Sequence, residues 1–125
     1  AIKSLTGTIS QVPPAFSAKS VNGTRAYDAA RRGEPLDLAA VDVTVHRWEP
    51  GALTRDSLSA VITCSGGTYI RALARDLGRL TSSAAHLKAL RRTRVGLFDV
   101  QDSATLESLA SRPPRVKALR IVSDA

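Results

Sequence analysis

One stretch of this 125-residue chain reads Cys64-Ser-Gly-Gly-Thr-Tyr-Ile-Arg-Ala-Leu-Ala-Arg-Asp76, and it joins a predicted strand to a predicted helix. The strand is indicated by period-two alternation over residues 58–64, and Gly66-Gly67 ends it. The helix is indicated by leucines that recur at helical spacing after residue 70. Tyr69 and Arg71 therefore stand at the helix start, where they bring an aromatic ring and a cation close together.

The predicted helix extends from Tyr69 to about Leu80 and has two different faces. Its apolar stripe, which is expected to pack on a sheet, consists of Ile70, Leu73, Leu77 and Leu80, and its basic side carries Arg71, Arg75 and Arg79. With Thr68 as N-cap, the free amides of the first turn add to the charge of Arg71. This helix start therefore favours a carboxylate or a phosphate as its neighbour.

The residues upstream predict short antiparallel strands and one small helix. The expected strands are residues 2–10, 16–21, 41–46 and 58–64, of which the last two form a hairpin across residues 49–56. Val12-Pro13-Pro14 ends the first strand, because proline removes backbone donors. Asn22-Gly23 predicts a tight turn, after which Thr24 caps a short helix through Arg32.

Downstream, residues 87–97 predict a strand that buries Leu87, Ala89, Val95 and Leu97 and exposes Lys88, Leu90, Arg92 and Arg94. Leu90 is then an exposed leucine among cations, which indicates a hydrophobic pocket inside a nucleic-acid site. A short helix is expected over residues 105–109, before a Pro113-Pro114 break and an apolar run over 119–122. Together these elements predict the α+β class: a mixed, mainly antiparallel sheet with a few packed helices.

The charge of the chain favours a polyanionic partner. The net charge is +7, arginine outnumbers lysine 14 to 4, and between residues 71 and 94 seven basic side chains face the single acid Asp76. Planar guanidinium groups pair with phosphates and stack on bases, so nucleic acid is favoured over a membrane surface. A basic surface without a ligand is the alternative.

The composition also restricts the cellular environment and the kinds of site that are expected. Cys64 is the only cysteine, which excludes an internal disulfide and a cysteine-based zinc site and fits a reducing, cytoplasmic environment. No apolar run approaches the roughly 18 residues of a membrane span, and no signal-peptide pattern is present. The chain starts at Ala1 and has no methionine, so we expect a segment upstream to be missing.

Other chemical motifs are weak. Gly66-Gly67-Thr68 lacks the Walker lysine and the Rossmann spacing. Cys64 with His86 could be a nucleophile and its base, but a lone cysteine at an inward strand position is more often a small core residue. His46 and His86 have no acidic residue at metal-ligand spacing. For Tyr69 and Arg71 the residues alone leave two interpretations open: a functional role, or packing over the helix start and capping of a neighbouring carbonyl.

Several segments of the chain resemble the TruB family of tRNA pseudouridine synthases. They are Cys64-Ser-x-Gly-Thr-Tyr-Ile-Arg71, Ala74-Arg-Asp-Leu-Gly78, Ala85-His-Leu-x-x-Leu-Arg-Arg-Thr-Arg-x-Gly96, Pro13-Pro-Ala-Phe-Ser-Ala18 and Val21-Asn-Gly-x-Arg-Ala-Tyr27. The resemblance covers roughly residues 5–110 in the family's order. The related guide-RNA-dependent, dyskerin-like enzymes lack the Val21–Tyr27 type of segment and the Ala30-Arg31 that follows it, so the stand-alone bacterial type is favoured.

The resemblance implies an activity and a set of site residues. The complete enzyme would convert the T-loop uridine at tRNA position 55 to pseudouridine, with an aspartate nucleophile and neither cofactor nor metal, after the base has left its stack. Arg71 would pair with that aspartate, Tyr69 would be the active-site tyrosine beside it, and Leu90 would pack against the extruded base. Residues 14–42 resemble the family's RNA-gripping insertion. The expected phosphate contacts are Lys19, Arg25, Arg31, Arg32, Arg92 and Arg94.

The chain differs from the family mainly because it lacks the motif that carries the catalytic nucleophile. The Gly-x-x-Asp-Pro-type motif that carries the nucleophile lies upstream of the Pro-Pro segment in the family and is not present here, and the tyrosine that stacks on the target base would also lie upstream. Ser20 and Gly66 stand where the family often has lysine. We therefore interpret residues 1–110 as the second half of the catalytic domain, and 111–125 as a linker towards an absent C-terminal RNA-binding domain. The isolated chain is expected to be inactive.

Two hypotheses of different classes follow. The first is a fragment of a tRNA pseudouridine synthase, with the tRNA T-stem loop and the missing N-terminal half of the same domain as partners, and with no membrane or small-molecule cofactor. The second is a non-catalytic basic RNA-binding module. A basic domain that binds another protein is a third, less specific possibility.

Overall fold

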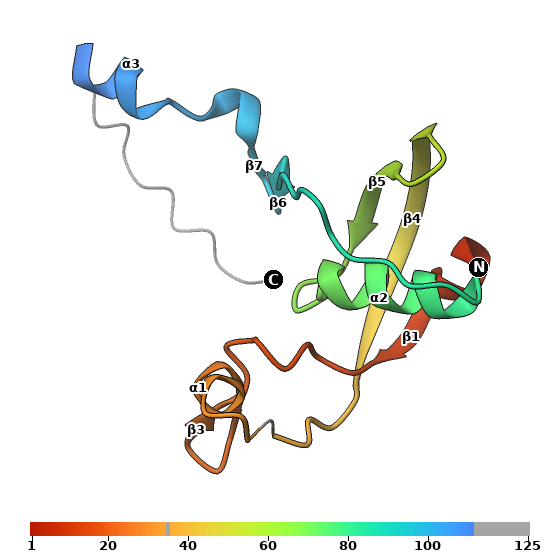
Figure 1. Ribbon diagram of the computed structural model, residues 1–125. Helices are drawn as coiled ribbons and strands as arrows, with labels where there is room; N and C mark the ends of the chain where they lie inside the picture. Colours follow the sequence, from red (N-terminus) through yellow and green to blue (C-terminus); the bar gives the residue numbers. More distant parts are fainter. Residues whose placement is uncertain (35, 112–125) are drawn as a thin grey trace. The chain divides into compact units, whose positions relative to one another are not determined.

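The computed structural model describes residues 1–34 and 36–111, and it divides into two units, residues 1–88 and 89–125 (Figure 1). The first unit is built on a three-stranded antiparallel sheet of order β1-β4-β5, formed by β1 (Gly7–Gln11), β4 (Val41–Leu53) and β5 (Leu58–Cys64). The predicted hairpin is confirmed, since Val45 pairs with Cys64 and Leu53 with Leu58. The connection predicted over residues 49–56 is too long, because β4 continues to Leu53 and the turn begins at Thr54. The α+β class is confirmed as well.

The first predicted strand is wrong in its N-terminal half. Residues Ile2–Leu5 form the 3-10 helix η1, whose Leu5 is buried and accepts a hydrogen bond on its carbonyl from the indole Nε1 of Trp48 at 3.1 Å. Strand β1 begins only at Gly7, which has a φ of +89°. It ends at Gln11, before the prolines, as predicted.

The insertion predicted over residues 14–42 contains a small hairpin and a helix (Figure 1). β2 (Ser20–Val21) and β3 (Thr24–Arg25) pair across Asn22-Gly23, whose φ angles of 50° and 80° confirm the tight turn. The strand expected over 16–21 is reduced to two residues. Thr24 is not the helix cap, because it pairs within β3 and α1 (Ala26–Arg31) begins after Arg25.

The predicted amphipathic helix is present as α2 (Ile70–Leu80), and Figure 1 shows it across one face of the sheet. Ala72 and Leu73 are fully buried on its inner side, whereas Leu80 is half exposed, so the apolar stripe is narrower than predicted. Thr68 is not its N-cap. The Thr68 hydroxyl donates back to the Ser65 carbonyl at 2.9 Å, and Tyr69 takes the N-cap position.

Gly78 of α2 explains one element of the Ala-Arg-Asp-Leu-Gly motif. A Cβ atom at this position would collide with the backbone of residues 84–85, which follow α2. The chain can therefore leave the helix and return close along it only if residue 78 has no side chain.

The second unit is described as far as residue 111. It contains a hairpin of β6 (Arg94–Val95) and β7 (Phe98–Asp99), the 3-10 helix η2 (Val100–Asp102) and α3 (Leu106–Ser111). The α3 helix confirms the one predicted over residues 105–109. The Pro113-Pro114 break and the 119–122 run lie outside the described residues.

The long strand predicted over residues 87–97 is wrong. Residues 84–93 form no regular helix or strand, and Gly96, with a φ of +56°, reverses the chain between β6 and β7. The proposed inward face does not exist, since Val95 and Leu97 are 57% and 84% exposed. Two-residue strands have too little surface to bury such a face.

Within residues 1–34 and 36–111, no helix combines the length and the apolar content that a membrane crossing requires.

Candidate functional site

The start of α2 is fixed by a side chain from the far end of β1. The amide of Gln11 bonds to both backbone groups of Tyr69: its Oε1 accepts from the Tyr69 N–H at 2.8 Å, and its Nε2 donates to the Tyr69 carbonyl at 3.2 Å. That carbonyl also accepts from the N–H groups of Ala72 and Leu73 at 3.0 and 3.1 Å. Gln11 is 0% exposed. The backbone of Tyr69 therefore has little freedom to shift or rotate.

Two arginines of α2 bind the loop that follows β1. Arg71 donates from Nη2 to the Phe16 carbonyl at 2.7 Å, and Arg75 donates from Nη2 to the Val12 carbonyl at 3.1 Å. Arg75 also bonds to both carboxylate oxygens of Asp76, at 2.8 and 3.0 Å. The capping of a neighbouring carbonyl by Arg71 is thus observed. Because a guanidinium group carries five N–H donors and Arg71 is exposed, this bond leaves it able to bind a further acidic group.

A series of contacts leads from Arg71 to the basic insertion. The ring of Phe16 lies edge-on to that of Tyr27, with 6.0 Å between centroids, and the guanidinium of Arg31 lies 5.1 Å from the centre of the Tyr27 ring. The Tyr27 N–H also donates to the Ser17 carbonyl at 3.1 Å. The helix α1 is therefore attached to the loop that Arg71 binds.

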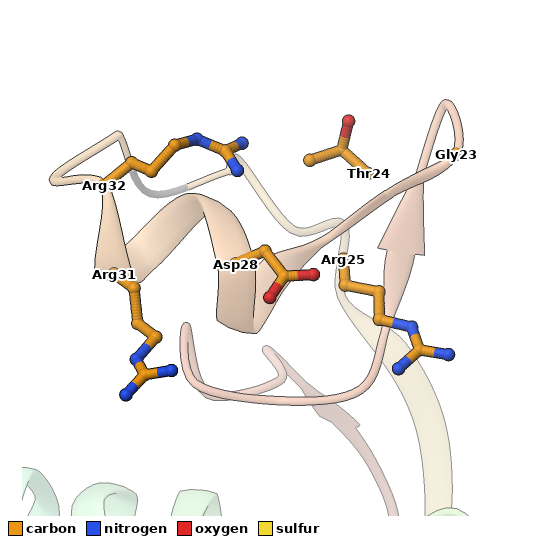
Figure 2. A pocket seen from close by; sticks show the side chains of 6 residues that line it. All are labelled: Gly23, Thr24, Arg25, Asp28, Arg31 and Arg32. Carbon is orange, nitrogen blue, oxygen red and sulfur yellow. The ribbon is translucent and has the colours of Figure 1, made fainter.

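Three of the predicted phosphate contacts line one open pocket. Arg25, Arg31 and Arg32 surround a depression of about 550 Å³ together with Gly23, Thr24 and Asp28. Figure 2 shows the arginine side chains coming from the end of β3 and from the C-terminal end of α1. Three cations against one carboxylate make the pocket basic. Lys19 is not among its lining residues; it precedes β2, and its carbonyl accepts from the Ala26 N–H at 2.8 Å.

The remaining predicted site residues belong to the second unit. Leu90 is 59% exposed, as predicted, although it lies in an irregular segment and not on a strand. Arg92 is exposed in the same segment. Arg94 begins β6, and its Nε lies 3.8 Å from a carboxylate oxygen of Asp99 across the hairpin.

The sequence interpretation missed Gln11 and Arg75 as parts of this site. A polar residue on the inward side of a strand is a signal that could have pointed to Gln11, since it follows Gly7 and Ile9 at period two. Its partner is 58 residues away in the sequence, and no local pattern connects the two. Arg75 was predicted only as one of three equivalent arginines of the basic helix side.

Comparison with known proteins assigns the chain to a family. Residues 1–70 match the model of the N-terminal domain of the TruB family pseudouridylate synthases, and residues 71–118 match that of the tRNA pseudouridylate synthase B C-terminal domain. The chain belongs to the TruB family of pseudouridylate synthases. The resemblance inferred from the motifs is thereby confirmed.

Individual relatives agree with this assignment. The tRNA pseudouridine synthase B of Arthrobacter sp. (strain FB24) is 49% identical over 116 residues, which cover 88% of this chain and 38% of the relative. Those of Mycobacterium ulcerans (strain Agy99) and Thermobifida fusca (strain YX) are each 50% identical over 117 residues, covering 90% and 87% of this chain and 39% and 40% of the relatives. The chain therefore spans about two fifths of the length of these relatives.

Proposed function

We propose that the protein containing this chain is a cytoplasmic tRNA pseudouridine synthase that isomerises the T-loop uridine at position 55 without a cofactor. The observation that carries the proposal is the Gly67-Thr-Tyr-Ile-Arg71 motif at the start of α2 in a chain of the TruB family. The names of the relatives, tRNA pseudouridine synthase B, support tRNA as the substrate.

In this proposal Arg71 and Tyr69 belong to the catalytic centre. Arg71 pairs with a nucleophilic aspartate that is supplied by a segment outside this chain, and its guanidinium fork suits a carboxylate. Tyr69 stands beside it, two residues earlier, at the N-cap of α2. The rigid attachment of Tyr69 to Gln11 supports the role, because catalytic groups act best when their positions are fixed before the substrate arrives.

RNA would be held by groups with two different physical roles. Arg25, Arg31 and Arg32 bind backbone phosphates in and around their open pocket, with Lys19 near them in sequence and Arg92 and Arg94 in the second unit. Leu90 carries no charge and packs against the base that has left its stack. Its exposure supports this role, since a leucine at 59% exposure is available to a ligand.

The proposal includes a division of the chain. Residues 1–110 form the second half of the catalytic domain, with residues 14–42 as the RNA-gripping insertion, and residues 111–125, of which 112–125 lie outside the described residues, lead towards a C-terminal RNA-binding domain. The family models divide the chain at another place, since the match to the C-terminal domain model begins at residue 71. The N-terminal half of the catalytic domain is then a partner of this chain within one protein.

Tritium release tests the function directly. The complete protein is incubated with a T-stem loop RNA that carries uridine tritiated at C5, because the formation of a carbon-linked nucleoside releases the hydrogen from that carbon. Release is expected, and a stem loop in which cytidine replaces the T-loop uridine, with the label in the other uridines, is the control without release. Tight binding of both RNAs without any release would instead favour the second candidate, a basic RNA-binding module, which the open arginine-lined pocket also fits.

A further inference from the structure

Gln11 is the fully buried polar side chain closest to the proposed catalytic centre, and both ends of its amide are used. One end accepts from the Tyr69 N–H at 2.8 Å, and the other donates to the Tyr69 carbonyl at 3.2 Å. A buried amide is costly unless it is hydrogen-bonded, so the pair of bonds also keeps Gln11 in one orientation. The last residue of strand β1 is thus hydrogen-bonded through its side chain to Tyr69, the N-cap residue of α2.

We propose that Gln11 is a positioning residue of the synthase reaction, which acts by holding Tyr69 at the place where the uridine is converted. The inference rests on the proposed function, because it assumes that Tyr69 is at the catalytic centre. Within the described residues, the side-chain amide of Gln11 hydrogen-bonds only to the backbone of Tyr69, so the effect of this amide on the reaction passes through Tyr69.

The chemistry of the amide explains why glutamine is needed. A glutamate at position 11 could still accept from the Tyr69 N–H, but it would place a carboxylate oxygen against the Tyr69 carbonyl. A methionine would fill a similar volume and make neither bond. Either change frees the N-cap residue of α2, and a displacement of about 1 Å at a catalytic group can lower a rate by about 100-fold.

The test uses the complete enzyme and single-turnover tritium release from T-loop RNA. Gln11→Met is expected to lower the rate by about 10-fold to 100-fold while tRNA binding stays within about twofold. The decisive measurement is a double-mutant cycle with Tyr69→Phe, which keeps the backbone bonds and removes the hydroxyl. If Gln11 acts through Tyr69, Gln11→Met costs less than about threefold in the Tyr69→Phe background.

A matched control separates positioning from loss of stability. Trp48→Phe removes another part-buried bond from a side chain of the same sheet to a backbone carbonyl, here from Trp48 Nε1 of β4 to the Leu5 carbonyl of η1 at 3.1 Å, and should leave the rate per folded molecule unchanged. Equal losses from Gln11→Met with and without Tyr69→Phe would overturn the proposal, as would a normal rate. If Gln11→Met does not fold, Gln11→Glu is used in the same cycle, and failure of both variants to fold would show that Gln11 is structural only.

The outcomes also distinguish this inference from the proposed function. Absence of tritium release from the unchanged complete enzyme would overturn the proposed function and this inference together. A Tyr69→Phe enzyme with a normal rate would overturn the catalytic role of Tyr69 and the positioning role of Gln11, and would leave the synthase activity itself intact. A Tyr69→Phe enzyme with a strongly reduced rate, combined with an additive or absent effect of Gln11→Met, would leave the proposed function intact and overturn the positioning role alone.

Discussion

Arg71 and Arg75 lie one turn apart on α2, and the structure predicts opposite consequences when each is changed to lysine. Arg71 is exposed, and within the described residues its side chain makes one hydrogen bond, to the Phe16 carbonyl at 2.7 Å. Such a bond contributes about 0.5–1.5 kcal/mol, and lysine can replace part of it. Arg71→Lys should therefore change the free energy of unfolding by less than about 1 kcal/mol. The rate of tritium release by the complete Arg71→Lys enzyme should fall by about 100-fold to 1000-fold, as when one preorganised electrostatic group is removed from an active site.

Arg75 is the matched comparison. Its side chain is 30% exposed, and it binds both oxygens of Asp76 and the carbonyl of Val12. An ammonium group cannot span these three acceptors with the geometry of the guanidinium fork. Arg75→Lys should lower the free energy of unfolding by about 1.5–3 kcal/mol, in the range for hydrogen bonds to charged groups, and leave turnover per folded molecule nearly unchanged.

Three assays on the complete enzyme distinguish these outcomes: urea unfolding, filter binding of tRNA, and single-turnover tritium release. Arg71→Lys should bind tRNA almost normally. If its binding fell in proportion to its rate, Arg71 would be an ordinary phosphate contact. Equal rate losses in the Arg71→Lys and Arg75→Lys enzymes would refute the reasoning in another way, because the common effect would then be displacement of the loop that both residues bind.

Three further predictions concern activity, base contact and phosphate contact. The isolated 125-residue chain should release no tritium from T-loop RNA, because it lacks the Gly-x-x-Asp-Pro-type motif of the nucleophile; release above background from the purified chain would contradict its assignment as a fragment. Leu90→Ala should cost less than about 1 kcal/mol of stability, against about 2–5 kcal/mol for a buried leucine, because Leu90 is 59% exposed. It should still slow the complete enzyme by about 5-fold to 150-fold with an unchanged salt slope of tRNA binding, whereas Leu97→Ala, at 84% exposure, should change neither the rate nor the salt slope. A large fall in the urea midpoint with a normal rate would show that Leu90 is a core residue. Arg32→Gln should reduce the magnitude of the salt slope of binding by about 0.7–0.9, and Arg55→Gln, on the exposed turn between β4 and β5, is the charge-matched control that should not. The same slope for both variants would argue against phosphate binding at the Arg25–Arg32 pocket.

The elements that the sequence predicted well are those that local forces determine. Asn22-Gly23 gave the correct turn because only residues that tolerate positive φ can close a two-residue hairpin. The α2 helix followed from its leucine spacing, and the β4–β5 hairpin from alternation on both strands. The predictions were less accurate at the ends of these elements. Thr68, for example, is not the N-cap of α2, because its hydroxyl donates a hydrogen bond to the Ser65 carbonyl, and Tyr69 takes that position.

The strand predicted over residues 87–97 failed for a different reason. The alternation of apolar and basic residues holds only at the two ends of this segment, because Leu90 and Arg91 interrupt it, and the chain reverses at Gly96. Alternation predicts burial only if another element covers the apolar face. In the second unit the described residues provide only the short β6–β7 hairpin and two small helices, so Val95 and Leu97 stay exposed.

Helical spacing correctly predicted one part of the functional site, the two arginines of α2 that bind the loop after β1. Arg71 and Arg75 were predicted to share one side of α2, and this spacing is the reason that both reach the loop after β1, where the Val12 and Phe16 carbonyls are also four residues apart. The loop is therefore held at two points, while Gln11, immediately before it, is held to Tyr69. Because Phe16 packs against Tyr27 and Tyr27 against Arg31, the direction in which the basic insertion leaves the sheet is set by α2 itself. The same helix start that presents Tyr69 thus also binds the loop whose Phe16 contacts the Tyr27 ring beneath Arg31, and this coupling depends on contacts between residues more than 50 positions apart, which no local pattern encodes.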